Sequence, residues 1–150
     1  NNAILMNSIV LFDGDKPGIF MNDQVESPSK NLTSKGYNLY DTVGGCVSSF
    51  TTNAADKAGM SISGLGLTWN AAGYYTWNGN VDAFTKAKLA DVESAVKTGC
   101  NKTVLTFSNI GLDYYNWLQS VGGGKNPLAY DQLGNVRSAT AMWPGAYEKH

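Results

Sequence analysis

The sequence predicts a mainly β fold with two or three helices. The first forty residues consist of short apolar, β-branched segments separated by turn residues. Two later segments, residues 85–98 and 109–121, have the apolar periodicity of amphipathic helices. The chain has 150 residues, of which 43% are hydrophobic and 15% are charged, a composition typical of a folded single domain.

The N-terminal strands are predicted from apolar runs. Residues 3–12 are β-branched and apolar, and Asn7 and Ser8 interrupt them, which indicates two short strands with a bend between them. Residues 13–18 are turn residues, residues 19–21 are predicted to form a further strand, and residues 22–35 a polar loop. Residues 36–41 are predicted to form another short strand that ends in a turn.

The middle of the chain is predicted to contain a hairpin. Residues 43–66 are rich in glycine and serine, and their weak alternation supports at most one strand. Two Thr-Trp-Asn triplets then flank Ala71-Ala72-Gly73, within residues 67–79. This pattern indicates a pair of aromatic strands joined by a turn in which Gly73 supplies a positive φ.

Two helices flank a predicted strand. Leu89, Val92 and Val96 share one face of the helix predicted over residues 85–98, and Gly99 ends it. Residues 103–107 have the composition of a strand. Ser108 is a good N-cap for the helix over residues 109–121, which the glycines at 122–124 terminate.

The C-terminal segment contains a turn flanked by opposite charges. Asp131 and Arg137, the only arginine of the chain, lie on either side of a Gly134-Asn135 turn. We expect an ion pair between Asp131 and Arg137 that locks this turn. Trp143 directly precedes Pro144-Gly145, and we expect its side chain to fill the core there.

Three stretches resemble a known family. Asn7-Ser8-Ile9-Val10 and Ser34-Lys35-Gly36-Tyr37-Asn38-Leu39 resemble the last coils of bacterial secreted right-handed parallel β-helix proteins, the parallel β-helix repeat or polymorphic outer-membrane-repeat class. The stretch Asp131 to Arg137, with Gly145-Ala146-Tyr147-Glu148, resembles their C-terminal closure. The resemblance implies that residues 1–45 are the last coil or coils of such a β-helix. It also implies an extracellular or cell-surface location.

The middle of the chain departs from this class. Residues 46–125 are longer and more helical than the closures of such proteins. We therefore expect residues 46–150 to form an α+β C-terminal cap, continuous with the coils as one structural unit. The last coil of a solenoid has unpaired backbone groups and needs a cap, and amphipathic helices such as residues 85–98 and 109–121 can cover such an end.

The predicted coils also need partners. One coil cannot bury its own apolar face, and this chain has residues for one or two coils. The chain opens on Asn1 without an initiator Met or a signal peptide, so we expect it to be part of a longer protein. The expected partners are upstream coils of the same polypeptide, or else another copy that pairs with the exposed coil edge.

The net charge and the cysteine content limit the kinds of binding partner and metal site that can be expected. The formal net charge is −1, which gives no electrostatic reason to expect nucleic acid or an anionic membrane as partner, and no apolar run is long enough to span a membrane. Cys46 and Cys100 form either a disulfide in an oxidising compartment or two buried thiols. Their spacing does not indicate a metal site, and no cofactor is predicted.

No catalytic constellation is evident in the sequence. The only histidine is the last residue, His150, which argues against Ser-His-Asp catalysis and histidine metal sites. Carboxylates remain as candidates for glycoside chemistry, which needs two of them across a sugar site. They are Asp13, Asp15, Asp23, Glu26 and Asp41. Asp13 and Asp15 lie in a Gly-Pro turn, where aspartate is common for structural reasons.

Aromatic residues suggest binding instead. Trp69, Tyr74, Tyr75 and Trp77 cluster within the predicted hairpin, where they either form a platform for a glycan or protein partner or pack in the core. Strand alternation places Tyr75 and Trp77 on one face and Tyr74 on the other.

We therefore expect a non-enzymatic structural region that supports adhesion or glycan contact by a secreted or cell-surface bacterial protein. The alternatives are a C-terminal fragment of a carbohydrate-active β-helix enzyme, a polysaccharide lyase or glycoside hydrolase with its catalytic residues upstream, and a free-standing sugar-binding module.

Overall fold

The fold is mainly β, as predicted. A computed structural model describes residues 2–12, 16–21, 31–45, 50–78, 84–99, 116–117, 119–121 and 123–149. The strands are β1 (Asn2–Met6), β2 (Ile9–Val10), β3 (Ile19–Met21), β4 (Asn31–Gly36), β5 (Leu39–Tyr40), β6 (Val43–Gly45), β7 (Phe50–Thr51), β8 (Leu67–Trp69) and β9 (Tyr75–Trp77). The helix α1 spans Leu89–Gly99, and the 3-10 helix η2 spans Pro127–Ala129. Residues 116–117 and 119–121 are also helical, and no described helix has the length and apolar character to cross a membrane.

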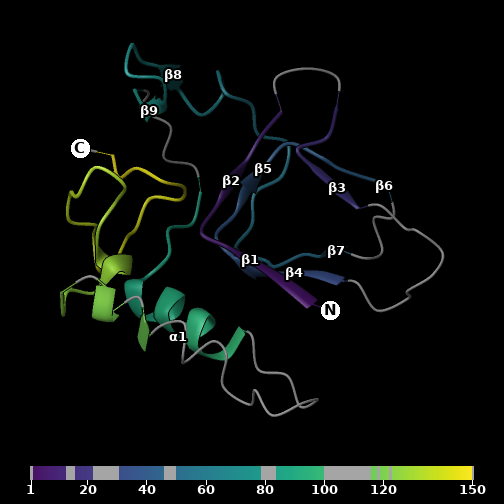
Figure 1. Ribbon diagram of the computed structural model, residues 1–150. Helices are drawn as coiled ribbons and strands as arrows, with labels where there is room; N and C mark the ends of the chain where they lie inside the picture. Colours follow the sequence, from purple (N-terminus) through teal and green to yellow (C-terminus); the bar gives the residue numbers. More distant parts are fainter. Residues whose placement is uncertain are drawn as a thin grey trace.

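The first seven strands form three layers of parallel pairs. β1, β2 and β3 pair in parallel with β4, β5 and β6, in that order (Figure 1). β7 then pairs in parallel with the other side of β4, and Lys57 forms a parallel bridge with Leu39. We call β1–β3 layer 1, β4–β6 layer 2, and β7 with the Lys57 bridge layer 3. Each passage of the chain therefore lies along the one before it.

A left-handed bend recurs in the first two layers. Asn7 has φ 49° between β1 and β2, and Tyr37 has φ 64° between β4 and β5. The backbone N–H of Asn7 donates to the carbonyl oxygen of Gly36 at 3.1 Å, which joins the two bends. Asparagine tolerates this conformation well, whereas a tyrosine adopts it only where its surroundings impose it.

Side chains alternate between two apolar clusters. Val10 and Tyr40 face an interior cluster with Ile19 and Phe50, in which the rings of Tyr40 and Phe50 meet edge to face at 5.6 Å. Their neighbours Ile9 and Leu39 face the opposite way, into a second cluster with Leu65, Trp77 and Trp143. The period of two along β2 and β5 therefore makes both faces of this sheet apolar.

The described residues after Lys57, which we call the capping region, pack against the side of the layers, whereas β7 and Lys57, within the cap predicted at 46–150, belong to layer 3. Leu65 and Trp77 of the capping region cover Leu39 on the outer face of the β2–β5 sheet, and α1 lies against β1. Figure 1 shows α1 and the yellow C-terminal segment beside the parallel strands. The helix α1 contacts β1, the edge strand of layer 1, and η2. The apolar outer face of β2 and β5 explains why the side is covered.

Several boundaries differ from the prediction. Residues 31–35, predicted as loop, belong to β4, because this segment pairs on both sides, with β1 and with β7. Residues 43–66 contain the two short strands β6 and β7 rather than at most one. The helix predicted from residue 85 begins at Leu89, because Ala87 first forms an antiparallel bridge with Met142.

Other predictions fall on parts of the chain outside the described residues. They are the strand at 103–107, the start of the helix at 109–121, Cys46, Cys100, and the carboxylates Asp13, Asp15, Asp23 and Glu26.

Candidate functional site

The hairpin that carries the aromatic residues is formed as predicted. β8 and β9 are antiparallel, with Trp69 opposite Tyr75 and Leu67 opposite Trp77, so these four side chains share one face. The turn is closed by Asn70, whose side-chain oxygen accepts from the N–H of Ala72 at 2.9 Å, and by Gly73 with φ 89°.

The four predicted platform residues have different surroundings. Trp69 is 60% exposed and Tyr75 37% exposed, and their rings meet edge to face at 5.0 Å. Trp77 is buried, and its ring packs against Phe84 and Trp143. The ring of Tyr74 lies 4.6 Å from that of Tyr147. The hairpin therefore presents Trp69 and Tyr75 to solvent, while Trp77 and Tyr74 attach it to the C-terminal segment.

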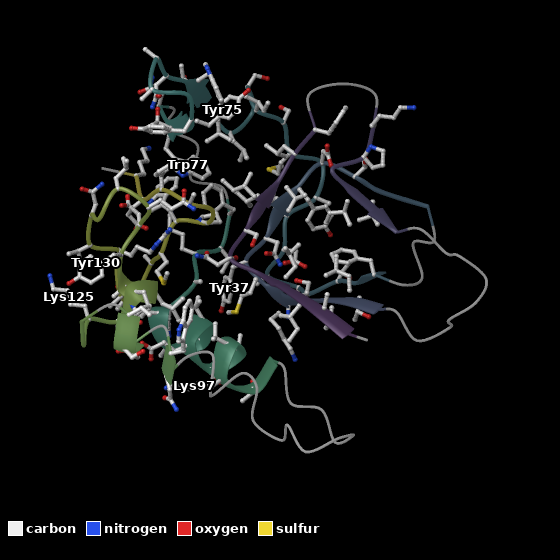
Figure 2. All side chains as sticks on the ribbon, viewed as in Figure 1. Tyr37, Tyr75, Trp77, Lys97, Lys125 and Tyr130 are labelled. Atoms are coloured by element: carbon white, nitrogen blue, oxygen red, sulfur yellow. The ribbon has the colours of Figure 1, made fainter. Side chains whose placement is uncertain are left out.

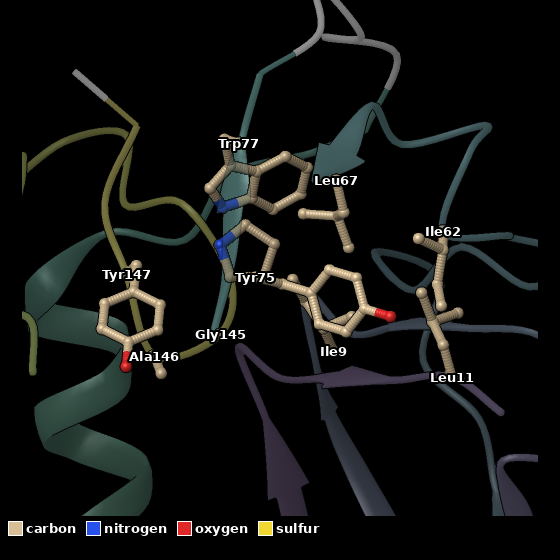
Figure 3. Close-up of a pocket in the computed structure, with 10 residues that line it drawn as sticks. Ile9, Leu11, Ile62, Leu67, Tyr75, Trp77, Gly145, Ala146 and Tyr147 are labelled. Carbon is tan, nitrogen blue, oxygen red and sulfur yellow. The ribbon is translucent and has the colours of Figure 1, made fainter. Parts of the chain in front are cut away.

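An apolar hollow lies beneath this aromatic edge. Its volume is about 250 Å³, and it is partly open to solvent. The lining residues come from β2, the hairpin region and the C-terminal segment: Ile9, Leu11, Ile62, Leu67, Tyr75, Trp77, Pro144, Gly145, Ala146 and Tyr147. Figure 3 shows Tyr147 at one end of the hollow and Ile62 and Leu11 at the other, with Trp77 and Tyr75 between them. Figure 2 labels Tyr75 and Trp77 near the hairpin, and Tyr37 near α1.

The predicted pairing of Tyr75 and Trp77 on one face is confirmed, because both line this hollow. Sequence reasoning did not identify Ile9, Leu11, Ile62 and Leu67 as lining residues. The only available signal was that Ile9 and Leu11 alternate with the inward-facing Val10.

Gly145 brings the C-terminal segment against β2. Its N–H donates to the carbonyl oxygen of Asn7 at 2.9 Å, and its φ is 88°. A Cβ atom on this residue would lie 2.9 Å from Cδ1 of Ile9. Only glycine satisfies both the conformation and the close approach, so the hollow depends on this position.

Asp131 organises the turn of the C-terminal segment. Its carboxylate accepts from the N–H groups of Leu133 at 2.9 Å, Asn135 at 2.8 Å and Glu148 at 3.2 Å. Gly134 occupies the positive-φ position of the turn, with φ 82°. Burial alone would raise the pKa of Asp131, but the Asn135 side chain and these N–H groups together hold it below its usual value.

The ion pair of Arg137 differs from the predicted one. Its guanidinium contacts Glu148 at 3.3 Å, with both side chains buried, whereas Asp131 serves as a backbone acceptor. Arg137 also donates to the carbonyl oxygens of Tyr130, Trp143 and Gly145. Glu148 lies seventeen positions after Asp131, and only tertiary structure brings it to the turn. Trp143 is partly buried and packs against the cluster of Leu39, Leu65 and Trp77, and Lys86 and Lys149 lie over its ring.

Asp41, one of the carboxylates considered for catalysis, has a structural role in the described fold. It accepts from the N–H of Phe12 at 2.9 Å and of Gly18 at 2.7 Å, across the turn between β2 and β3. Burial would raise the pKa of Asp41, but these donors and the N–H of Thr42 lower it. Among the described residues, no three His, Cys, Asp or Glu side chains lie close enough together to hold a metal ion.

The chemistry available at the hollow is apolar recognition. Its lining contains no charged side chain, and two aromatic rings form its exposed edge. Such a surface suits a neutral group with an apolar face rather than an ion. No protein-family model, no curated protein and no solved structure matches the chain.

Proposed function

We propose that this chain is the terminal part of a right-handed parallel β-helix in a secreted or cell-surface bacterial protein. Its role is structural and non-enzymatic: it forms the last layers of the stack, covers their side with an α+β cap, and presents an aromatic edge for adhesion or glycan contact. The observation that carries the proposal is the register. Three strands of one passage pair in parallel with three strands of the next, in the same order.

The interior apolar cluster also supports the proposed parallel β-helix. Layer 1 contributes Ile19, layer 2 contributes Tyr40 and layer 3 contributes Phe50 to one continuous apolar core. A stack of passages around a shared interior is the arrangement that a solenoid needs, because each layer buries its apolar face only against its neighbours.

The aromatic edge supports a contact role. Trp69 and Tyr75 are exposed side by side above an uncharged hollow, and large rigid rings of this kind are enriched at binding surfaces. We assign glycan or adhesive contact to this edge and not to Trp77, whose ring belongs to the core.

Duplication of one layer tests the proposal. Ile9 pairs with Leu39, so a second copy of residues 9–38 inserted between Asn38 and Leu39 adds exactly one passage in register. We expect this variant to fold cooperatively as one more layer. Its guanidinium m-value should rise by about one fifth, because the slope follows the surface that unfolding exposes.

The matched control inserts the same thirty residues in scrambled order, which cannot continue the strand register. We expect it to unfold the chain or to leave a rapidly exchanging loop. If the in-register duplication behaves like the scrambled one, the chain is not a solenoid and the proposal is wrong.

A further inference from the structure

Layer 1 has an open face. β1, β2 and β3 each pair on one side only among the described residues, and in all three cases the partner is layer 2. At this face Ile19 is buried, Leu5 and Val10 are partly buried, and Ala3 is exposed. Unpaired edges of this kind readily accept another strand.

At the bends, backbone N–H groups donate to side chains of the following layer. The N–H of Ser8 in layer 1 donates to Oδ1 of Asn38 in layer 2 at 3.0 Å. The N–H of Asn38 in turn donates to Oδ1 of Asp56 at 3.1 Å. Ser8, Asn38 and Asp56 each precede the residue that pairs across the layers, namely Ile9, Leu39 and Lys57. They therefore occupy equivalent positions, and each layer accepts the bend N–H of the layer before it.

At the next turn, the Asp41 side chain likewise accepts from N–H groups of the layer before it. It lies in layer 2 and accepts from the N–H groups of Phe12 and Gly18 in layer 1. The side-chain amide of the buried Asn38 also reaches layer 1, but as a donor, to the carbonyl oxygen of Leu5. In the described layers, the side-chain acceptors of these N–H groups thus belong to the later layer.

In layer 1, Ser8 occupies the position that Asn38 and Asp56 occupy in the following layers. Its hydroxyl donates to the carbonyl oxygen of Met6 at 2.8 Å, and a hydroxyl oxygen can also accept. No described N–H donates to it. The equivalent oxygens of Asn38 and Asp56 both accept from the preceding layer, so Ser8 Oγ holds the position of the acceptor for a layer before layer 1.

We infer that the open face of layer 1 binds one more strand–bend–strand layer, whose bend N–H is accepted by Ser8 Oγ. The inference rests on the proposed function and names the partner of that stack. A second copy of this chain is a poorer fit, because parallel stacking would require it to present layer 3. That side offers only the two residues of β7 and the Lys57 bridge.

An N-terminal extension tests this inference. Asn2 pairs with Asn31, so a copy of residues 2–30 fused directly before Asn2 reproduces the native junction in register. We expect the copied strands to gain protection from hydrogen exchange. Ser8→Ala should then lower the folding equilibrium constant roughly fivefold more in the extended chain than in the native one, because only the extended chain makes the new bond.

Two variants isolate the role of the hydroxyl. Ser8→Asn should keep the coupling to the extension, because its side-chain oxygen can accept as that of Asn38 does. Ser61→Ala removes the acceptor of the Gly64 N–H in a distant turn and should have the same effect in both chains.

The outcomes separate the two proposals. An unprotected extension, or equal Ser8→Ala effects in both chains, overturns the inference even if the internal duplication folds. A failed internal duplication rejects the solenoid itself. A concentration-dependent dimer of the native chain with protected β1 amides would show that a second copy is the occupant, and would also overturn the inference.

Discussion

At the scale of single residues, buried charges hold the C-terminal segment in place. Asp131 binds backbone donors from two parts of this segment, and Arg137 joins Glu148 to three carbonyl oxygens. The sequence indicated that Asp131, Gly134 and Arg137 belong to one closing turn. It could not indicate Glu148 as the partner of Arg137, because that choice depends on where the chain returns after Trp143.

The carboxylate of Asp131 should make stability depend on pH. Its folded pKa lies below the ordinary value of 3.8, so its contribution is present above that pH. The contribution is lost as the pH falls through the folded pKa, when the native carboxylate takes up a proton. Urea unfolding between about pH 5 and pH 2 should show the wild-type free energy falling more steeply than that of Asp131→Asn. Equal slopes for the two proteins would contradict this assignment.

Two glycines with similar backbone conformations should differ in their tolerance of a methyl group. Gly134 has φ 82° and no atom near the position of a Cβ, so Gly134→Ala should cost about 1 kcal/mol of unfolding free energy. Gly145→Ala should cost roughly 1–3 kcal/mol more, since its Cβ would collide with Ile9. Chemical denaturation of both variants gives the comparison, and equal losses would mean that the contact with Ile9 is dispensable.

At the scale of elements, the hairpin separates a core tryptophan from an exposed one. Trp77→Ala should cost about 3–5 kcal/mol because its ring packs with Leu39 and Leu65. Trp69→Ala should change stability by less than about 0.5 kcal/mol, because the residue is mostly exposed.

The Trp69→Ala variant also tests glycan contact. On a glycan array, the native chain should bind and Trp69→Ala, still folded, should lose binding. Thr68→Ala is the matched control, because Thr68 lies on the opposite face of β8. Retained binding by Trp69→Ala would remove the aromatic edge from the contact surface.

The elements predicted correctly are those with a strong local signal. The apolar run before and after Asn7 predicted β1 and β2, and the triplets around Gly73 predicted the hairpin. The segment of β4 has one large apolar residue, Leu32, among polar ones, and it is a strand because neighbours pair with it on both sides. The hollow could not be predicted, because its lining comes from three distant segments that only tertiary packing brings together.

At the scale of the whole molecule, the parallel layers and the capping region share residues. Leu39 belongs to layer 2 and is buried by Leu65 and Trp77 of the cap. Asn7, at the bend of layer 1, accepts from the N–H of Gly145 and donates to the carbonyl oxygen of Trp143. Among the described residues, the core of the cap on this side therefore includes Leu39 and Ile9 of the layers, and the outer face of β2 and β5 would be exposed without the cap.

We accordingly expect the layers and the cap to unfold together. All four tryptophans, at positions 69, 77, 117 and 143, lie in the capping region, so their fluorescence reports on the cap alone. Amide exchange of β1 and β4 reports on the layers. In a guanidinium titration the two probes should give the same midpoint, and Leu39→Ala should lower both midpoints equally, because its side chain belongs to the shared cluster. Thr33→Ala, within β4 but outside both apolar clusters, is the control and should shift either midpoint little. A fluorescence transition well before the loss of β1 and β4 protection would mean that the cap is a separate cooperative unit attached to an independently stable stack.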